Sequence, residues 1–204
     1  MGMSTSPYEK DFIRSHLKSG GARKLLEIGA FKGETTRVLY DATVQQAGRL
    51  VVIDPMTWSS EAVRNGLARH LRWVPMKTWD KVERLLPTFS YEKDFWQALG
   101  TEDRQRLRLY RSRSTDAELL QSPEEDLAEF DFAFIDGDHS YQGVRSDLQH
   151  WGRRVKKGGW VLVHDCVPRF QGVMDAIHEW VGSDTTRRAH WPTKGTICAI
   201  EVKA

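Results

Sequence analysis

Residues 24–54 read KLLEIGAFKGETTRVLYDATVQQAGRLVVID, and this stretch decides the fold. Two short apolar runs, 24–28 and 49–54, flank a segment at 34–46 whose apolar residues lie on one helical face. A strand, a helix and a second strand within about thirty residues form a βαβ unit, and such a unit implies a parallel sheet. The fold class predicted from this stretch is therefore α/β.

The rest of the chain repeats this alternation of strands and helices. Further strands are expected at 107–110, 130–135 and 160–163, and further helices at 7–18, near 115–121, near 141–154 and at 171–181. Two strand-like runs in the tail, 186–191 and 196–202, are separated by the short segment PTKG. A short connection that contains proline and glycine favours a hairpin, so these two runs should pair antiparallel.

Residues 55–105 interrupt the alternation, because they combine four of the eight tryptophans with many charges and no strong strand pattern. Helical stretches are expected near 60–70, 79–86 and 91–99. The usual connection between two elements is far shorter, so we interpret 55–105 as a helical insertion after the second strand. Its tryptophans can pack as the core of the insertion or contact a substrate. The chain, 1–204, is expected to be one domain that begins with a helix within residues 1–20.

Composition excludes several classes of protein. The chain is 40% hydrophobic and can bury a sizeable core, yet no apolar run approaches the roughly 18 residues of a membrane span. A net charge of +2 gives no reason to expect a nucleic-acid partner. Cys166 and Cys198 provide neither a disulfide framework nor a zinc-ligand spacing, so a cytoplasmic, reducing location is expected.

The loop between the first strand and the helix indicates a nucleoside cofactor. Gly29 and Gly33 let the backbone approach a ligand closely, and the helix that follows offers free N–H groups. Asp54 ends the next strand, where an acid can bind both hydroxyls of a ribose. A glycine turn and a helix-capping acid would explain these residues without a ligand, but the full combination favours a cofactor.

The same loop narrows the choice of cofactor. A dinucleotide-binding loop reads G-x-G-x-x-G, whereas this loop reads G-x-x-x-G with Phe31 at the place of the middle glycine. Glu27, just before the loop, is unfavourable for a phosphate because both groups are negative. A carboxylate there suits a cationic or hydrogen-bond-donating ligand, such as the amino-acid end of S-adenosylmethionine.

Acids and histidines follow two of the expected strands. Asp136 and His139 come after one strand, and His164 and Asp165 come after the next. Because the carboxyl ends of parallel strands meet at one edge of a sheet, these four side chains should converge. They can hold one divalent metal ion such as Mg²⁺, or His139 can remove a substrate proton directly. The alternative is that the acids cap helices and the histidines are ordinary surface residues.

The chain resembles class I S-adenosylmethionine-dependent methyltransferases in four segments: LEIGAFKGETT, VVIDP, FIDGDHSYQGVRSDLQHW and KKGGWVLVHD. It is most similar to the bacterial group called methyltransferase family 24, often found with sugar and natural-product pathways, and the likeness spans residues 24–181. The resemblance implies a Rossmann-like fold with a seven-stranded, mostly parallel sheet and an antiparallel C-terminal hairpin. It also implies a helical insertion after the second strand that helps to cover the active site.

Cofactor roles follow from this resemblance. It implies that the loop around the methionine part of the cofactor includes Glu27, Gly29, Ala30 and Gly33. It also implies that the ribose is bound by Asp54 and the adenine by Ser112 and Arg113, with Asp136 beside the cofactor as well.

Metal and catalytic roles are implied too. Asp136 matches a metal-binding acid of the metal-dependent members, Asp165 matches a second ligand, and His164 is a further candidate ligand. His139 matches a catalytic base, and Asp136 is expected to act beside it. Catechol-type relatives have asparagine where this chain has Cys166, a poor Mg²⁺ ligand, so a requirement for Mg²⁺ is left open.

The function expected from the sequence is transfer of a methyl group from S-adenosylmethionine to a hydroxyl oxygen of a small molecule or sugar. Two alternatives are a nicotinamide-dependent oxidoreductase and a non-catalytic scaffold that binds the cofactor. No nucleic-acid or membrane partner is expected. A homodimer is compatible with the N-terminal helix and the tryptophan-rich insertion.

Overall fold

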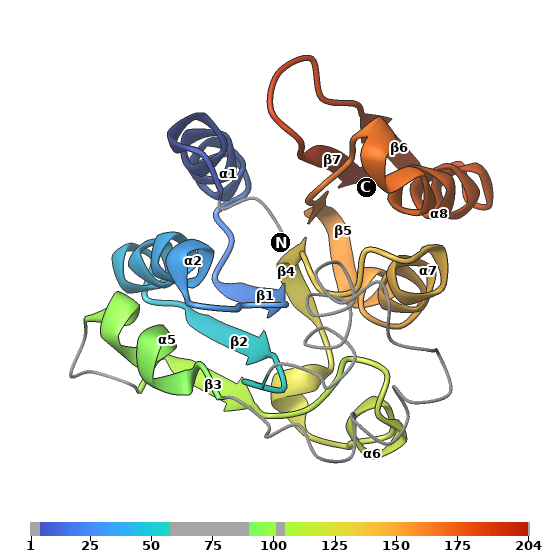
Figure 1. Ribbon diagram of the computed structural model, residues 1–204. Helices are drawn as coiled ribbons and strands as arrows, with labels where there is room; N and C mark the ends of the chain where they lie inside the picture. The colour runs from blue at the N-terminus through green and yellow to red at the C-terminus, as the bar shows by residue number, and fades with distance from the viewer. Residues whose placement is uncertain (1–4, 58–89, 101–104, 204) are drawn as a thin grey trace, which may run out of the picture.

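The computed structural model describes residues 5–57, 90–100 and 105–203, which form one sheet with helices on both faces (Figure 1). Its strands are β1 (Lys24–Ile28), β2 (Arg49–Ile53), β3 (Leu107–Tyr110), β4 (Phe130–Ile135), β5 (Val155–Val163), β6 (Arg187–His190) and β7 (Cys198–Val202). They lie in the order β3-β2-β1-β4-β5-β7-β6. Strands β1 to β5 pair in parallel, whereas β7 is antiparallel to both β5 and β6. The predicted fold class and the C-terminal hairpin are confirmed.

Helices cover the two faces of the sheet as separate layers (Figure 1). They are α1 (Pro7–Gly20), α2 (Glu34–Gln45), α5 (Glu92–Leu99), α6 (Ala117–Leu120), α7 (Tyr141–His150) and α8 (Gln171–Gly182). Successive side chains of a strand point to opposite faces, so each face of the sheet has its own hydrophobic core. In β1, Leu25 belongs to the core under α1, α2 and α5, and Leu26 to the core under α6, α7 and α8.

The position of β1 decides where a ligand can bind. Strand β1 lies between β2 and β4, so the order of the strands reverses there. In open parallel sheets, the connections at such a reversal leave in opposite directions and open a crevice at the carboxyl ends of the strands. The loop after β1 and the loop after β4 therefore form the walls of the expected site.

The boundaries of α7 and β5 differ most from the sequence prediction. Helix α7 ends at His150 and a 3₁₀ turn (Gly152–Arg154) follows, and β5 begins at Val155 instead of residue 160. The register between β4 and β5 shifts, since Phe130 pairs with Val155 whereas Phe132 pairs with Trp160. A bulge of this kind inserts extra residues between two paired segments of one strand. From the sequence pattern alone, such residues are predicted to form a turn.

Only part of the expected helical insertion lies within the described residues. Helix α5 confirms the stretch expected at 91–99, and its buried Phe95 and Leu99 pack against α2. Trp96 is partly buried against the same core, and its Nε1 donates a 3.0 Å hydrogen bond to Glu92 Oε1. The helices expected near 60–70 and 79–86, with Trp73 and Trp79, lie outside the described residues. In the described part of the chain, no helix has the length and apolarity to cross a membrane.

Candidate cofactor cleft and acid–histidine cluster

A cleft of about 380 Å³ lies at the carboxyl ends of β1, β2 and β4. Its walls come from three loops: the β1–α2 loop with Gly29 and Phe31, residues 113–115 after β3, and residues 136–138 after β4. Asp54 and Tyr91 also line it. The cleft therefore occupies the crevice that the strand order predicts.

Glycine is required at the first position of the β1–α2 loop. Gly29 has φ +81°, a region that side chains other than glycine rarely adopt. A Cβ at this position would lie 2.2 Å from the carbonyl oxygen of Asp136 on the opposite wall. The amide of Gly29 donates a 3.0 Å hydrogen bond to the carbonyl of Ile53. The loops after β1, β2 and β4 are thus in direct backbone contact, and this contact fixes the base of the cleft.

Phe31 occupies the place of the missing middle glycine in an unusual conformation. Its φ is +46°, in the left-handed region, and its side chain is 45% exposed at the cleft. Its ring lies 5.2 Å from the ring of Tyr91 in an edge-on contact. The loop therefore presents an aromatic side chain to the cleft at the position where a dinucleotide-binding loop has glycine.

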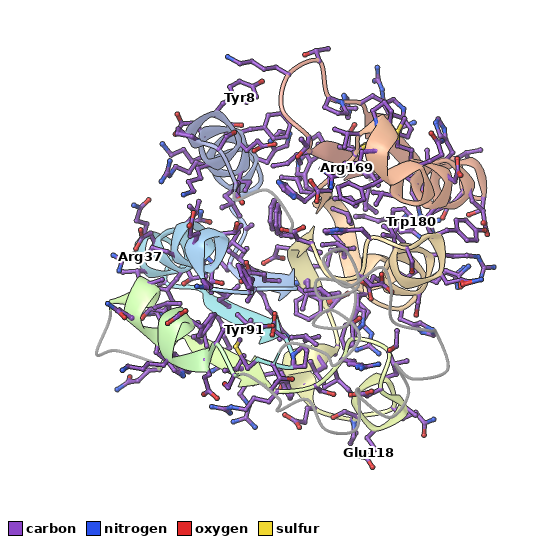
Figure 2. All side chains as sticks on the ribbon, in the orientation of Figure 1. Tyr8, Arg37, Tyr91, Glu118, Arg169 and Trp180 are labelled. Atoms are coloured by element: carbon purple, nitrogen blue, oxygen red, sulfur yellow. The ribbon has the colours of Figure 1, made fainter. Side chains whose placement is uncertain are left out.

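Asp54, expected to bind ribose, is at the cleft but is already fully hydrogen-bonded. Its Oδ2 accepts from the amides of Ala30 (2.8 Å) and Phe31 (3.0 Å). Its Oδ1 accepts from the amide of Met56 (2.6 Å) and the hydroxyl of Tyr91 (2.7 Å), which Figure 2 shows beside β2. These four donors match the roughly four acceptor positions of a carboxylate. Ribose binding by Asp54 stays a prediction, and it requires one of these donors to give way.

Glu27 is a buried carboxyl group with no hydrogen-bond partner among the described residues. Burial raises its pKa well above the usual value, and the neighbouring charges of Asp54 and Asp136 raise it further. A buried acid without a donor is costly unless a ligand or water supplies one. Glu27 is 0% exposed and does not line the cleft, and neither do Ala30 and Gly33, so their contact with a cofactor stays a prediction.

Of the two residues expected to contact adenine, one lines the cleft and the other does not. Arg113 lines the cleft as predicted, together with Ser114 and Thr115. Ser112 does not line it, because its hydroxyl donates a 2.6 Å hydrogen bond to Asp116 Oδ2. The sequence placed these candidates in a loop that lines the cleft, but it could not show which side chains of an irregular loop face inward, and adenine binding stays a prediction.

Acids and histidines from the ends of β4 and β5 converge as expected. A ligand atom of each of Asp136, His139 and Asp165 lies within 4.8 Å of the other two. Asp136 Oδ1 is 3.2 Å from His139 Nε2 and also 3.2 Å from His164 Nδ1. His164 is buried, and its Nε2 lies 3.9 Å from Glu9 Oε1. The helix-cap alternative does not describe Asp136, whose carboxylate lies between two imidazoles.

The charges of this cluster are interdependent. Burial opposes ionisation of Asp136 and of His139, but their mutual hydrogen bond outweighs it. The pKa of Asp136 is thereby lowered, and the pKa values of His139 and His164 are raised. Asp165 differs, since burial raises its pKa even though both histidines act to lower it.

Asp165 is the strained member of the cluster. It is 1% exposed, its φ is +55°, and neither carboxylate oxygen has a hydrogen-bond partner among the described residues. Strain and an unsatisfied buried acid together are typical of a functional position. Carboxylates of this kind fit a hard divalent cation. Cys166, next to it, is buried in the same hydrophobic core as Cys198 of β7.

Three residues near the site were missed by the sequence analysis. Tyr91 lies in the insertion, and its spacing in the sequence cannot show that its hydroxyl forms a hydrogen bond with Asp54. Glu9 is buried and accepts hydrogen bonds from the amide (2.7 Å) and hydroxyl (2.8 Å) of Thr196. Its only sequence signal is the capping box with Ser6, which predicts a helix start. Phe170 places its ring 4.9 Å from that of His139.

Comparison with solved structures gives the same fold. O-methyltransferase TomG from Streptomyces achromogenes, in complex with SAM, is 19% identical over 98% of this chain and 82% of its own, with TM-score 0.63. An O-methyltransferase from Bacillus cereus, in complex with SAH, is 19% identical over 97% and 82%, with TM-score 0.59. Cofactor-bound Rv0187 from MTB is 17% identical over 98% and 82%, with TM-score 0.64. At these sequence identities, the comparison shows that the folds are similar and nothing beyond that.

Comparison of the sequence with curated proteins gives no match. Comparison with family models matches residues 26–166 to the family described as "Methyltransferase domain", the group Methyltransf_24. The matched residues contain the β1–α2 loop, Asp54, and the whole acid–histidine cluster from Asp136 to Asp165. The family expected from the sequence is confirmed, and the chain belongs to this family of class I methyltransferase domains.

Proposed function

We propose that this protein transfers a methyl group from S-adenosylmethionine to a hydroxyl oxygen of a small molecule or sugar. One observation carries the proposal: Asp136 both lines the cleft and belongs to the acid–histidine cluster. A cofactor in the cleft and an acceptor at the cluster would therefore meet at this residue. Positioning two reactants in this way supplies most of the rate acceleration in a direct transfer.

Each wall of the cleft has a role in holding the cofactor. The β1–α2 loop, of which Gly29 lines the cleft, would hold the methionine end together with Ala30 and Gly33, and the ammonium group of that end would supply the donor that the buried Glu27 lacks. Asp54 binds the ribose, and Arg113 with its two neighbours contacts the adenine. When bound, the cofactor supplies an electrophilic methyl group on a sulfonium.

His139 is the proposed base. Its Nε2 is oriented by Asp136, and its Nδ1 lies 3.5 Å from Asp165 Oδ2, without a hydrogen bond. Nδ1 is therefore the nitrogen proposed to accept the hydroxyl proton of the acceptor. The aromatic ring of Phe170 beside His139 offers an apolar surface for the acceptor.

Asp136 and Asp165 are the proposed ligands of a divalent cation, with His164 behind them as an orienting partner of Asp136. A cation such as Mg²⁺ would lower the pKa of the acceptor hydroxyl. The carboxylate of Asp165 has no hydrogen-bond partner among the described residues, and this supports the assignment. His139 is left free for proton transfer, because a nitrogen that binds a metal ion has no lone pair to accept a proton.

The proposal is tested by transfer of an isotope-labelled methyl group to a panel of sugars, phenols and other hydroxylated small molecules. The wild type should label at least one class of acceptor. His139→Gln should lose about 100-fold or more in rate, the usual contribution of a general base. His178→Gln is the matched control, because His178 is an exposed residue of α8 that stacks on Trp191 and does not belong to the cluster. Equal rates for the two variants would remove His139 from the mechanism.

A further inference from the structure

Glu9, in the first turn of α1, is a buried acid with no part in the mechanism above. Its Oε2 accepts hydrogen bonds from the amide (2.9 Å) and hydroxyl (2.7 Å) of Ser6, as a capping box requires. Its Oε1 accepts from the amide (2.7 Å) and hydroxyl (2.8 Å) of Thr196, which lies 187 residues further along the chain. Burial raises the pKa of Glu9, but these four hydrogen bonds outweigh it and lower the pKa below its usual value. Helix capping explains one oxygen of this ionised group and leaves the other unexplained.

The segment that Glu9 holds is itself bonded to the residue after Asp165. The carbonyl oxygen of Thr196 accepts a 2.7 Å hydrogen bond from the amide of Cys166. Gly195 allows the close approach, because a Cβ there would lie 3.0 Å from Cγ and 3.1 Å from Oε1 of Glu9. An unbroken series of hydrogen bonds therefore runs from α1 through the segment before β7 to the end of β5.

Glu9 also faces the residue before Asp165. Its Oε1 lies 3.9 Å from Nε2 of the buried His164, and Nδ1 of the same imidazole lies 3.2 Å from Asp136 Oδ1. At 3.9 Å the carboxylate and the imidazole pack directly against each other without a hydrogen bond. Asp165 therefore lies between two neighbours that Glu9 contacts, one directly and the other through Thr196.

The backbone of Asp165 needs support of this kind. Its φ of +55° lies in the left-handed region, and its carbonyl oxygen accepts a 2.9 Å hydrogen bond from the amide of Val167 in a tight turn. A strained conformation persists only where the surrounding structure fixes it. The hydrogen bond between the Cys166 amide and Thr196 fixes this turn from one side, and the contact between Glu9 and His164 fixes it from the other.

We propose that Glu9 is a positioning residue, which holds Asp165 at its place in the acid–histidine cluster. It acts through its hydrogen bonds to Thr196 and through its contact with His164. The inference rests on the proposed function and extends the site beyond the residues matched to the methyltransferase family, 26–166, which contain neither Glu9 nor Thr196. Glu9 does not line the cofactor cleft, so it affects the rate of transfer and not the affinity for the cofactor.

Four variants separate positioning from a general effect on the fold. Glu9→Ala removes the acceptor of both Thr196 donors, whereas Glu9→Gln keeps a side-chain oxygen that can accept from both. Thr196→Val is a milder change, because it removes only the hydroxyl donor. Thr5→Val is the matched control: the hydroxyls of Thr5 and Thr35 lie 2.6 Å apart and anchor the segment before α1 to α2, away from the cluster.

Hydrogen exchange followed by NMR tests the positioning without any ligand. The Cys166 amide is compared with the amide of Gly29, which donates a 3.0 Å hydrogen bond to the carbonyl of Ile53 at the base of the cleft. Relative to Gly29, exchange at Cys166 should be roughly tenfold faster in Glu9→Ala, the effect of one lost hydrogen bond, and less accelerated in Thr196→Val. Glu9→Gln and Thr5→Val should resemble the wild type. Equal acceleration of both amides in Glu9→Ala, or none at Cys166, would overturn the inference.

Transfer kinetics on a labelled acceptor test the consequence for the reaction. In Glu9→Ala, kcat should fall about tenfold while KM for S-adenosylmethionine stays unchanged, and Glu9→Gln should restore most of the rate. An unchanged kcat in Glu9→Ala, or an equal fall in Thr5→Val, would overturn the inference. A folded wild type that transfers no methyl group, combined with selective acceleration at Cys166 in Glu9→Ala, would overturn the proposed function and uphold the support of Asp165 by Glu9.

Discussion

The hydroxyl of Tyr91 donates a 2.7 Å hydrogen bond to Oδ1 of Asp54, the acid expected to bind a ribose. Burial and the charge of Asp54 raise the pKa of Tyr91, so the hydroxyl stays protonated and acts as a donor. The other three donors to Asp54 are backbone amides of the surrounding loops. Tyr91 is therefore the donor that a ribose hydroxyl can replace at the smallest structural cost.

Tyr91→Phe should tighten the binding of S-adenosylhomocysteine. The variant keeps the ring that contacts Phe31 but removes the competing donor, so the ribose gains an acceptor on Asp54 without displacing anything. A net gain of one hydrogen bond corresponds to about a twofold to tenfold lower dissociation constant. Calorimetry measures it, with Tyr110→Phe as the control because the hydroxyl of Tyr110 bonds to Glu124 instead. Weaker binding by Tyr91→Phe would show that the hydroxyl contacts the ligand.

Gly29→Ala should abolish cofactor binding and destabilise the fold. The new Cβ would meet the carbonyl of Asp136 at 2.2 Å, in addition to the strain of φ +81°. Gly158→Ala separates these two effects, since Gly158 has φ +82° and open space around it. The control should lose only about 1–2 kcal/mol in free energy of unfolding, the cost of the left-handed conformation. Urea unfolding and calorimetry together check this, and similar losses in both variants would disprove the contact.

Replacing Asp147 should change the pH dependence of stability. Burial, together with the nearby charge of Asp138, raises the pKa of Asp147 to about 7. Between its usual value of 3.8 and about 7, the folded state binds more protons than the unfolded state, so stability falls as pH rises. Asp147→Asn does not titrate and should gain stability relative to wild type over this window, by at most about 4 kcal/mol.

The matched variant Asp131→Asn should show the opposite trend. The amides of Lys24 and Arg23 outweigh burial and lower the pKa of Asp131, so this carboxylate stabilises the fold once it is ionised. The variant should lose stability relative to wild type as pH rises toward the usual value of 3.8, and the difference should stay constant at higher pH. Urea unfolding across the pH range measures both variants. A pH-independent difference for Asp147→Asn would mean that its carboxyl group titrates normally.

Asp165→Asn should stabilise the metal-free protein and weaken its binding of Mg²⁺. The substitution removes a buried carboxylate without hydrogen-bond donors, and asparagine tolerates the left-handed conformation well. A higher melting temperature is expected, with a gain of about 1–3 kcal/mol. Added Mg²⁺ should raise the melting temperature of the wild type more than that of the variant. A lower melting temperature in the metal-free variant would show that Asp165 is satisfied in the fold.

The sequence predicted the parts of the site that depend on strand ends. Gly29, Asp54 and Asp136 each follow an apolar strand, and a parallel sheet brings such positions together without further information. Tyr91 and Asp147 could not be predicted in this way. Tyr91 reaches Asp54 from a long insertion, and Asp147 resembles any polar residue of an amphipathic helix until packing shows that it faces inward.

Binding of S-adenosylmethionine, measured by calorimetry with and without Mg²⁺, tests the central claim most directly. The wild type should bind with a micromolar dissociation constant, and Asp54→Ala should lose binding while circular dichroism shows that it remains folded. That result would establish the cofactor and the cleft that holds it. A folded wild type that fails to bind S-adenosylmethionine under both conditions would contradict the account.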